Sequence, residues 1–321
     1  MKNKLLNNFF YYLVASLVPN FVGLIMLPLY TRYLTPDDYG VLALVFSIQS
    51  FLPILFTLQL HNTISRFYFD YYHDHEKLKT FISTILVFCL IMSIPILALI
   101  MIYLDEILHF LFPSLTSYKK LFTLGIYASF FDVYKATFVQ ILRVQEKAKL
   151  FMKVSILLFF ISTTIFLSEV VIFQRYALGA VEANLISTFL SCITYLYIVR
   201  NLLIPKIDVN LLKGPFQFSI PLVPHSLSGI VFMYSDRIIL ERNVTLGAIG
   251  IYLLSDKFAK AIKLIVNQFN LAFLPYFNRI SKKSKLIATQ ETKEISNIVS
   301  YLLIIFLSVI TLFSVEIIDL I

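Results

Sequence analysis

Long apolar runs separated by short polar segments make up most of this chain. A helix needs roughly 20 mainly apolar residues to cross the hydrocarbon core of a bilayer. The pattern therefore predicts an all-α fold, a polytopic membrane helix bundle with about nine transmembrane helices. We place these helices over Phe9–Tyr30, Tyr39–Leu60, Phe81–Tyr103, Leu121–Leu142, Val154–Phe173, Ala177–Val199, Phe218–Ile239, Gly247–Leu274 and Ile298–Phe313.

The polar segment Tyr30–Gly40 connects the first two of these runs. Thr35 is a residue type that caps helices, and Pro36 suits the first helical position. Asp37 and Asp38 fall in the first turn, where acidic side chains interact favourably with the helix dipole. Asp38 follows Thr35 by three residues, so the two can form a capping box. The segment predicts a tight turn between two antiparallel helices.

The composition is that of a membrane protein. The 321 residues are 59% hydrophobic and 14% charged, with a mean hydropathy of +0.82, whereas a soluble domain carries about 25% charged residues. The net charge of +8 does not indicate nucleic-acid binding, because the basic residues lie in short loops between apolar runs. Cys89 and Cys192 fall inside apolar runs, which predicts buried thiols and no disulfide.

No group of residues typical of an enzyme stands out in the sequence. It contains no nucleotide-binding loop, no glycine-rich phosphate cradle and no Cys or His cluster at metal-ligand spacing. His73 and His75 lie among three acidic residues, which is more typical of a solvated charged loop than of a metal site. We therefore expect no catalytic residue, no metal site and no cofactor.

The basic residues are distributed unevenly between the two sides of the predicted bundle. Seventeen of the 27 Lys and Arg residues lie in loops on the side of the N-terminus, and six lie in loops on the other side. Cytoplasmic loops carry the excess of Lys and Arg in membrane proteins. We therefore predict a multi-pass protein with a cytoplasmic N-terminus, whose last residues reach the outer face.

Three short matches between the two halves of the chain indicate an internal repeat. Their offset is 205 residues at first and 210 later, so the repeat unit is six helices and both copies have the same orientation. We predict two parallel six-helix repeats, with a first lobe at residues 1–205 and an incomplete second lobe at 206–321. Since the second lobe stops about halfway through its repeat, we expect a fragment or a truncated reading frame. The matching segments are Val18–Asn20 with Val223–His225, Tyr39–Val41 with Ile249–Ile251, and Glu106–Leu108 with Glu316–Ile318.

Ionisable residues inside predicted membrane helices are costly, so they usually face a cavity or a partner. In the eighth run, five polar residues follow helical spacing and fall on one narrow face. This face either lines a cavity or packs against the other lobe through buried pairs such as Asp256–Lys260. The five residues are Asp256, Lys260, Lys263, Asn267 and Asn270.

Polar residues also interrupt the second, fourth and seventh runs. Asp132 and Lys135 in the fourth run either neutralise each other or face a cavity. Arg66 follows Gln59 and Asn62 at helical spacing beyond the second run, and it either lines a cavity or reaches lipid headgroups. Asp236 and Arg237, which end the seventh run, are either an interface anchor or an ion pair at an outer gate.

The candidate cavity residues are mainly cationic, which suits an anionic cargo and phosphate above all. Arg143, at the inner end of the fourth run, adds to this balance. The candidate substrate-binding residues are Arg66, Lys135, Arg143, Lys260, Lys263 and Asn267, and the candidate gating or ion-pair residues are Asp132, Asp236, Arg237 and Asp256.

Three segments resemble the polysaccharide-export flippases, the Wzx-type O-antigen and teichoic-acid group of the MOP superfamily. They are PLYTRYLTPDDYGVLAL (Pro28–Leu44), ILRVQEKAKLF (Ile141–Phe151) and SIPLVPHSLSGIVFMYSDRIIL (Ser219–Leu240). The resemblance implies a two-lobed bundle of roughly twelve to fourteen helices in the bacterial plasma (inner) membrane. It also implies that the bundle flips an undecaprenyl-diphosphate-linked oligosaccharide from the inner to the outer leaflet by alternating access, for O-antigen or capsule biosynthesis.

We therefore expect a non-enzymatic flippase whose partners are the lipid-linked oligosaccharide and membrane lipids, with the polysaccharide polymerase and glycosyltransferases as further candidates. Asp37 and Asp38 are expected to cap a helix at the outer rim and not to bind cargo. Two alternatives remain open. A multidrug or cation antiporter of the same superfamily would favour acidic residues within the lobes, and the seventh run has only Asp236. A non-transporting scaffold for glycan assembly would be compatible with an incomplete second lobe.

Overall fold

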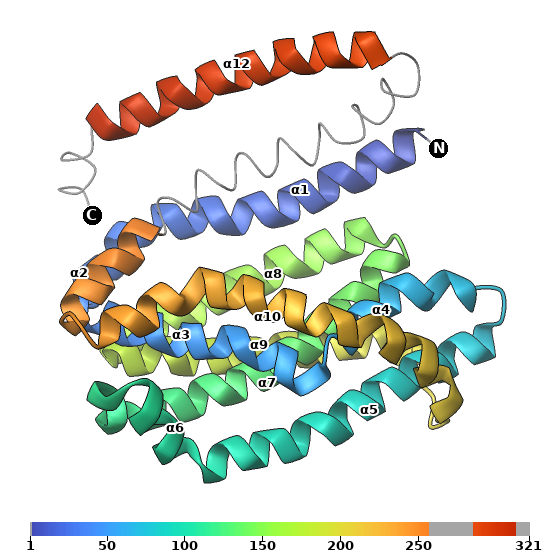
Figure 1. Ribbon diagram of the computed structural model, residues 1–321, viewed down its shortest axis with the longest axis horizontal. Coiled ribbons are helices and arrows are strands. Elements are labelled where there is room, and N and C mark those ends of the chain that lie inside the picture. Colours follow the sequence, from blue (N-terminus) through green and yellow to red (C-terminus); the bar gives the residue numbers. More distant parts are fainter. Residues whose placement is uncertain (1, 257–284, 313–321) are drawn as a thin grey trace. The chain divides into compact units, whose positions relative to one another are not determined.

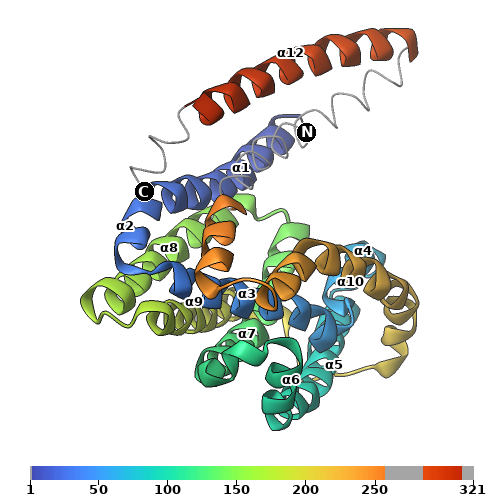
Figure 2. The same cartoon turned by 60° about the vertical axis from the view of Figure 1, so that its left-hand side comes forward.

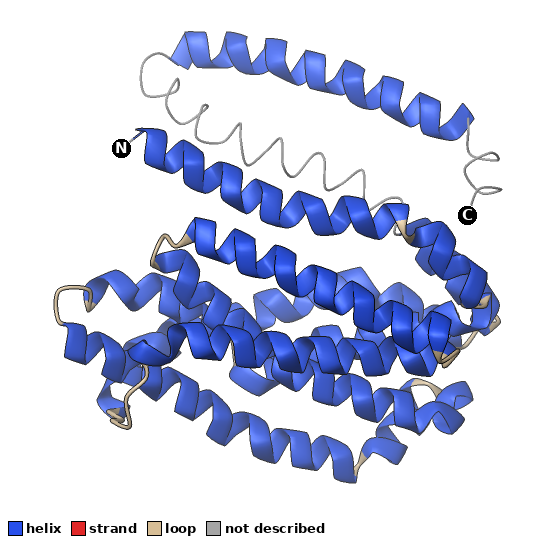
Figure 3. Cartoon of the chain, turned by 180° about the vertical axis from the view of Figure 1, so that it is seen from behind, coloured by secondary structure: helices blue, strands red, loops and turns tan. Residues whose placement is uncertain are grey.

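The computed structural model describes residues 2–256 and 285–312, which form helices and loops without any strand (Figure 3). This confirms the predicted all-α fold class. The described residues belong to two compact units. One unit contains the residues up to Pro19 and from Tyr33 to Leu253, and the other contains Asn20–Arg32 and the described residues from Leu254 onward. The two repeats, with lobes at 1–205 and 206–321, stay a prediction.

The helices follow one another along the chain with short connections (Figure 1). Within the described residues, five segments are long and apolar enough to cross a membrane: Pro36–Thr57, His75–Ile102, Ala148–Ile172, Tyr176–Leu202 and Val209–Glu241. The α-helices are α1 (Lys2–Ile25), α2 (Leu27–Tyr33), α3 (Pro36–Thr57), α4 (Leu60–Phe67), α5 (His75–Ile102), α6 (Leu104–Leu111), α7 (Lys119–Val144), α8 (Ala148–Leu167), α9 (Tyr176–Val199), α10 (Lys213–Glu241), the segment Leu246–Asp256 and α12 (Lys285–Leu312). Short 3₁₀ helices cover Tyr68–Asp70, Pro113–Tyr118, Arg200–Leu202 and Val209–Leu212, and a π-helix over Ser168–Ile172 extends α8.

Two predicted helices are wrong in their continuity. The first apolar run is divided at Met26 into α1 and α2. The second run ends at Thr57, because Leu58 and Gln59 adopt left-handed backbone conformations with φ of 46° and 63°. Such residues stop an α-helix and redirect the chain. Asn62 and Arg66 therefore lie on a separate helix, α4, with Gln59 at its N-cap, and not on the second predicted helix.

The C-terminal predictions are described only in part. The eighth run is seen as a helix from Leu246 to Asp256, and its remaining residues lie outside the described part of the chain. Lys260, Lys263 and Asn267 are among those residues. The ninth helix was predicted to begin at Ile298, but α12 begins at Lys285 and includes the polar residues that precede the apolar run.

Helix α3 lies at the centre of the first unit, with α5, α7, α9 and α10 packed around it (Figures 1 and 2). In the most apolar, membrane-length part of α3, 61% of the residues are buried. The corresponding share is 6% in the segments Ala148–Ile172 and Val209–Glu241. Leu44 and Phe56 of α3 are completely buried, as is Phe81 of α5. The exposed faces of the outer helices are apolar as well, and such faces are compatible with lipid.

Candidate functional site

The N-terminus of α3 is fixed by the residues that the sequence singled out. The backbone N–H of Thr35 donates to Asp38 Oδ2 over 2.9 Å, and the backbone N–H of Asp38 donates to Thr35 Oγ1 over 3.2 Å. This reciprocal pair is the predicted capping box, and Pro36 occupies the first helical turn. Asp38 Oδ1 also accepts a hydrogen bond from the backbone N–H of Ala177 over 3.3 Å. The same carboxylate therefore joins the first turns of α3 and α9.

The first turn of α3 crosses the helix Leu246–Asp256 with direct backbone contact. A Cβ atom added to Gly40 would lie 2.1 Å from the carbonyl oxygen of Leu246, and one added to Gly250 would lie 1.9 Å from the carbonyl oxygen of Pro36. These separations are far below van der Waals contact, so only glycine fits at either position. We call Pro36, Gly40, Leu246 and Gly250 the glycine crossing.

The two contacts of the glycine crossing are reciprocal. Pro36 and Leu246 are 210 residues apart, and so are Gly40 and Gly250. Each glycine meets the carbonyl of the residue that stands four positions before the other glycine. This is the pattern of a self-complementary contact. If residue i of one copy contacts residue j of the other, then residue j of the first copy contacts residue i of the second.

The last turns of α10 lie at the same end of the bundle. The hydroxyl of Tyr252 donates to Asp236 Oδ2, and the backbone N–H of Arg237 donates to Asp236 Oδ1 over 2.8 Å. The Arg237 side chain is almost fully buried, with its guanidinium carbon 4.9 Å from the centre of the Tyr234 ring. Asp236 thus connects α10 to the helix that carries Gly250, the ring contact of Arg237 lies within α10, and a direct Asp236–Arg237 ion pair stays a prediction.

Glu241 is a buried polar contact that the sequence reasoning missed. Its Oε1 atom accepts from the backbone N–H of Ser114 over 3.1 Å and from the Ser114 hydroxyl over 2.6 Å. Nearby, Arg242 Nη2 donates to the carbonyl oxygen of Phe110 over 2.7 Å. The two contacts join the end of α10 to the last turn of α6, through Phe110, and to the 3₁₀ helix that follows it, through Ser114. Glu241 follows Arg237 by one helical turn, and this spacing was the signal available in the sequence.

The opposite end of the bundle carries two of the predicted cationic residues, and both are exposed. The guanidinium carbon of Arg143, in the last turn of α7, lies 5.4 Å from the centre of the Phe151 ring. That ring packs against Tyr12 of α1, with 5.6 Å between the ring centroids. The guanidinium carbon of Arg66, in α4, lies 5.7 Å from the centre of the Phe67 ring. Stacking on aromatic rings holds both planar cations without neutralising them.

Asp132 and Lys135 form an ion pair along α7, with side chains that are 45% and 31% exposed. The structure therefore contains the mutual neutralisation that was one of the two interpretations of this pair. Asp256 is half-buried at the limit of the described residues. Within residues 2–256 and 285–312, no group of three or more His, Cys, Asp or Glu residues could hold a metal ion.

Two comparisons with known proteins found similar sequences. A sequence profile of the family described as "Polysaccharide biosynthesis protein" matches residues 5–281. A protein of Haemophilus influenzae named for the Lsg locus is 23% identical over 288 residues, covering 87% of this chain and 67% of that protein. No solved structure matches the chain.

Proposed function

We propose that this chain, which belongs to the polysaccharide biosynthesis protein family, translocates a lipid-linked oligosaccharide across a bacterial plasma membrane by alternating access. The family and the membrane-length helices support the coarser statement, a membrane protein of polysaccharide biosynthesis. The proposal adds the flippase activity, an undecaprenyl-diphosphate-linked cargo and an O-antigen or capsule product. The proposed role is transport and not catalysis.

The reciprocal glycine crossing is the observation that carries this proposal. Two parallel repeats related by a twofold axis along the membrane normal would bring equivalent residues together at that axis. Gly40 and Gly250 meet in this way, with the offset of 210 residues that the internal matches gave. We infer that the crossing is where the first and second lobes touch, and that it closes the outer end of the cargo path.

The cationic end supplies the complementary half of the mechanism. Arg66 and Arg143 remain exposed there, and arginine is well suited to bind phosphate in two-point contacts. We propose that they attract the diphosphate of the cargo at the cytoplasmic face while its prenyl chain stays in lipid. Lys135, Lys260, Lys263 and Asn267 are proposed to continue this path toward the membrane centre.

Transport then requires the crossing to separate. With Gly40 and Gly250 in contact, the cargo path opens only toward the cationic end. When the lobes rock apart at the crossing, the path opens outward, as in other transporters built from repeats. Asp236 and Arg237 lie in the last turns of α10, near the crossing. We propose that they break and re-form their contacts during this movement.

A disulfide across the crossing tests the proposal. A Cβ added to Gly247 would lie 3.6 Å from the Cβ of Pro36, within the range of about 3.5–4.5 Å found in disulfides. Pro36→Cys with Gly247→Cys, in a background with Cys89→Ala and Cys192→Ala, should therefore cross-link under oxidation. Translocation of lipid-linked oligosaccharide in proteoliposomes should then stop and should recover on reduction.

The single-cysteine variants are the matched controls, since oxidation should leave their transport unchanged. Transport by the cross-linked protein at the rate of the reduced protein would exclude the crossing as a gate.

For cargo binding, Arg66→Ala with Arg143→Ala should reduce translocation at least about tenfold, because a charged hydrogen bond contributes roughly 1.5–3 kcal/mol. Lys153→Ala, an exposed cation of α8 near the same end, is the control and should have little effect.

A further inference from the structure

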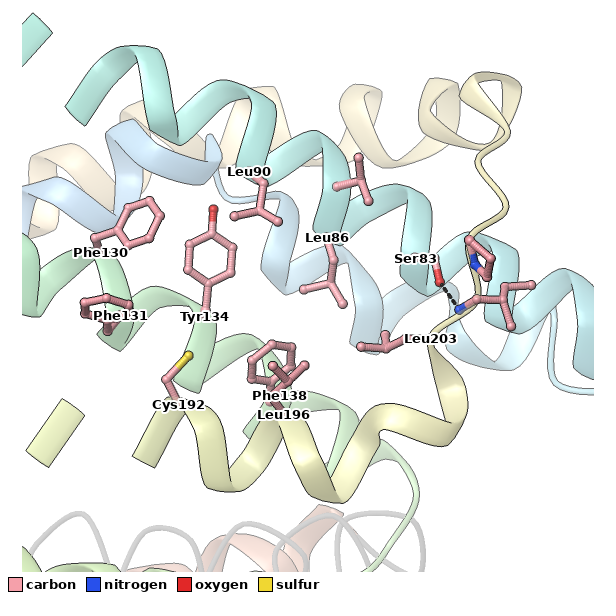
Figure 4. Close-up of a pocket in the computed structure, with 13 residues that line it drawn as sticks. Ser83, Leu86, Leu90, Phe130, Phe131, Tyr134, Phe138, Cys192, Leu196 and Leu203 are labelled. Carbon is pink, nitrogen blue, oxygen red and sulfur yellow. Dashed lines mark hydrogen bonds between the residues drawn. The ribbon is translucent and has the colours of Figure 1, made fainter. Parts of the chain in front are cut away.

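An apolar groove lies on the flank of the first unit, between α5 and α9, with α7 as its floor (Figure 4). Its volume is about 470 Å³. Helix α7 packs along α9 over much of its length but contacts α5 only briefly, so α5 and α9 diverge and leave the groove between them. Its lining includes Ser83 and Leu90 of α5, Phe131 and Tyr134 of α7, Leu196 of α9 and Leu203.

The polar groups of the lining are engaged within the protein. The hydroxyl of Ser83 accepts a hydrogen bond from the backbone N–H of Ile204 over 2.9 Å (Figure 4). The Tyr134 hydroxyl is hydrogen-bonded to Ser93 Oγ over 2.5 Å. A sugar or a peptide would leave its own polar groups unsatisfied against such walls, and this is costly. The walls therefore suit a hydrocarbon chain.

The groove is open along the side of the bundle. Leu90 on one rim is 37% exposed and Leu196 on the other is 38% exposed. The neighbouring Ile94 and Ile193 are also exposed apolar residues of α5 and α9. Both helices belong to segments of membrane length. The groove is therefore accessible from the side of the bundle.

One end of the groove is cationic. Lys79 stands one helical turn before Ser83, on the same face of α5. Arg200 follows α9 three residues before Leu203, and its guanidinium carbon lies 3.9 Å from the centre of the Tyr197 ring. Lys206 follows the lining loop, but its ammonium group is bound to Glu76 over 2.8 Å. Asp208 lies at the same end, where its backbone N–H donates to Thr84 Oγ1 over 3.0 Å, so Lys79 and Arg200 leave an excess of positive charge where the apolar walls end.

We propose that this groove binds one acyl chain of an anionic glycerophospholipid, with the phosphate headgroup beside Lys79 and Arg200. The apolar walls select the chain, the open side admits it from the bilayer, and the cationic end selects the anionic headgroup. The binding site belongs to α5, α7 and α9 and is separate from the glycine crossing. It therefore does not depend on the proposed transport cycle.

A single tryptophan can report on the groove, because the chain has no Trp of its own. Phe131→Trp places an indole in the floor of the groove, and Phe160→Trp on the exposed face of α8 is the matched control. Each variant is reconstituted with phosphatidylglycerol or phosphatidylcholine carrying brominated acyl chains, which quench Trp fluorescence. At residue 131 the affinity for phosphatidylglycerol should exceed that for phosphatidylcholine by about fivefold. This is the effect of one basic residue beside an anionic lipid. At residue 160 the two lipids should quench equally.

Headgroup variants test the charge argument. Lys79→Ala with Arg200→Ala should bring the preference at residue 131 to that of the control, whereas Lys119→Ala with Lys120→Ala, at the other end of the bundle, should leave it unchanged. Leu196→Trp, on the side of the groove formed by α9, replaces Phe131→Trp if that variant does not fold. Equal quenching by both lipids would overturn the proposal. Undecaprenyl phosphate that displaces the brominated lipid better than phosphatidylglycerol does, at equal mole fraction, would also overturn it and assign the groove to a prenyl chain.

Discussion

The two ends of the first unit are built in different ways. At the end with the glycine crossing, helices meet backbone to backbone, and the charged side chains of Arg237 and Glu241 are buried. At the cationic end, Arg66 and Arg143 are exposed and are held by aromatic rings. At Gly40 and Gly250 the first end has no room for an added Cβ atom, whereas the second end presents exposed arginine side chains.

This difference shows where the fold tolerates change. Tight helix crossings in membranes depend on small residues, because association there relies on close packing and not on the exclusion of water. Exposed cations at helix ends contribute little to stability, so they are available to bind anions. We therefore expect substitutions at the crossing to affect the fold, and substitutions at the cationic end to affect cargo binding.

The largest effect is expected at the crossing. Gly40→Ala would bring a methyl group to 2.1 Å from a backbone carbonyl oxygen, and backbone atoms cannot move aside as a flexible side chain can. The free energy of unfolding should fall by at least about 3 kcal/mol, the upper part of the range for overpacked sites. Thermal unfolding of the purified protein in detergent measures this loss.

Gly229→Ala is the matched control for this experiment. Gly229 is also inside a helix, but a Cβ added there meets no atom within 4 Å. Alanine at this position should leave the protein unchanged or stabilise it by up to about 1 kcal/mol, because alanine favours helix more than glycine does. Equal stability of the two variants would remove the contrast between a tight and an open position.

The second prediction concerns pH at the other end. His61 lies in α4, which packs against α5, α7 and α10, and its Nδ1 is 2.8 Å from Thr57 Oγ1. Burial lowers the pKa of His61 from 6.5 to about 4. The unfolded chain therefore binds this proton at a higher pH than the folded protein does. Stability should fall as the pH drops from about 6.5 toward 4, by no more than about 3 kcal/mol.

His61→Gln should flatten this part of the stability profile, because glutamine does not titrate. The measurement is the unfolding temperature between pH 7 and pH 4 for both proteins. Carboxylates contribute to the same pH range, so the informative quantity is the difference between the two profiles. A difference that does not change with pH would contradict the lowered pKa of His61.

The third prediction concerns the link between α10 and Ser114. Glu241→Ala removes two hydrogen bonds to a buried carboxylate, and the loss should be about 2 kcal/mol, since hydrogen bonds to charged groups are worth roughly 1.5–3 kcal/mol. Ser114→Ala removes only the hydroxyl contact, because the backbone N–H still reaches Glu241. A double-mutant cycle of the two changes measures the coupling. Additive losses would contradict a direct contact.

The sequence predicted the capping box of Thr35 and Asp38 because that signal is local and follows from spacing along a helix. The sequence match of Gly40 with Gly250 did not predict that the two residues touch. Apolar runs located most of the long helices but not the short helices α4 and α6. Family resemblance and helix pattern led to the same fold class.

Other features depended on backbone geometry or on distant contacts. The left-handed conformations of Leu58 and Gln59 carry no sequence signal, since neither residue is one that favours that conformation. The contact between Glu241 and Ser114 joins residues 127 positions apart, and helical periodicity does not relate such positions. The apolar groove exists because α5 diverges from α9, and an apolar face alone does not show what lies opposite it.

The smallest effect is expected at the Asp132–Lys135 pair, and it separates stability from transport. Both side chains are partly exposed, and an i,i+3 pair of this kind contributes at most about 0.5–1 kcal/mol. Asp132→Asn with Lys135→Gln should therefore leave the unfolding temperature almost unchanged. If Lys135 also binds the cargo, the double variant should still translocate lipid-linked oligosaccharide more slowly, and Lys135→Ala alone should slow it equally. A variant of unchanged stability and unchanged transport rate would reduce the pair to mutual neutralisation on α7 and leave the cationic end as the binding site.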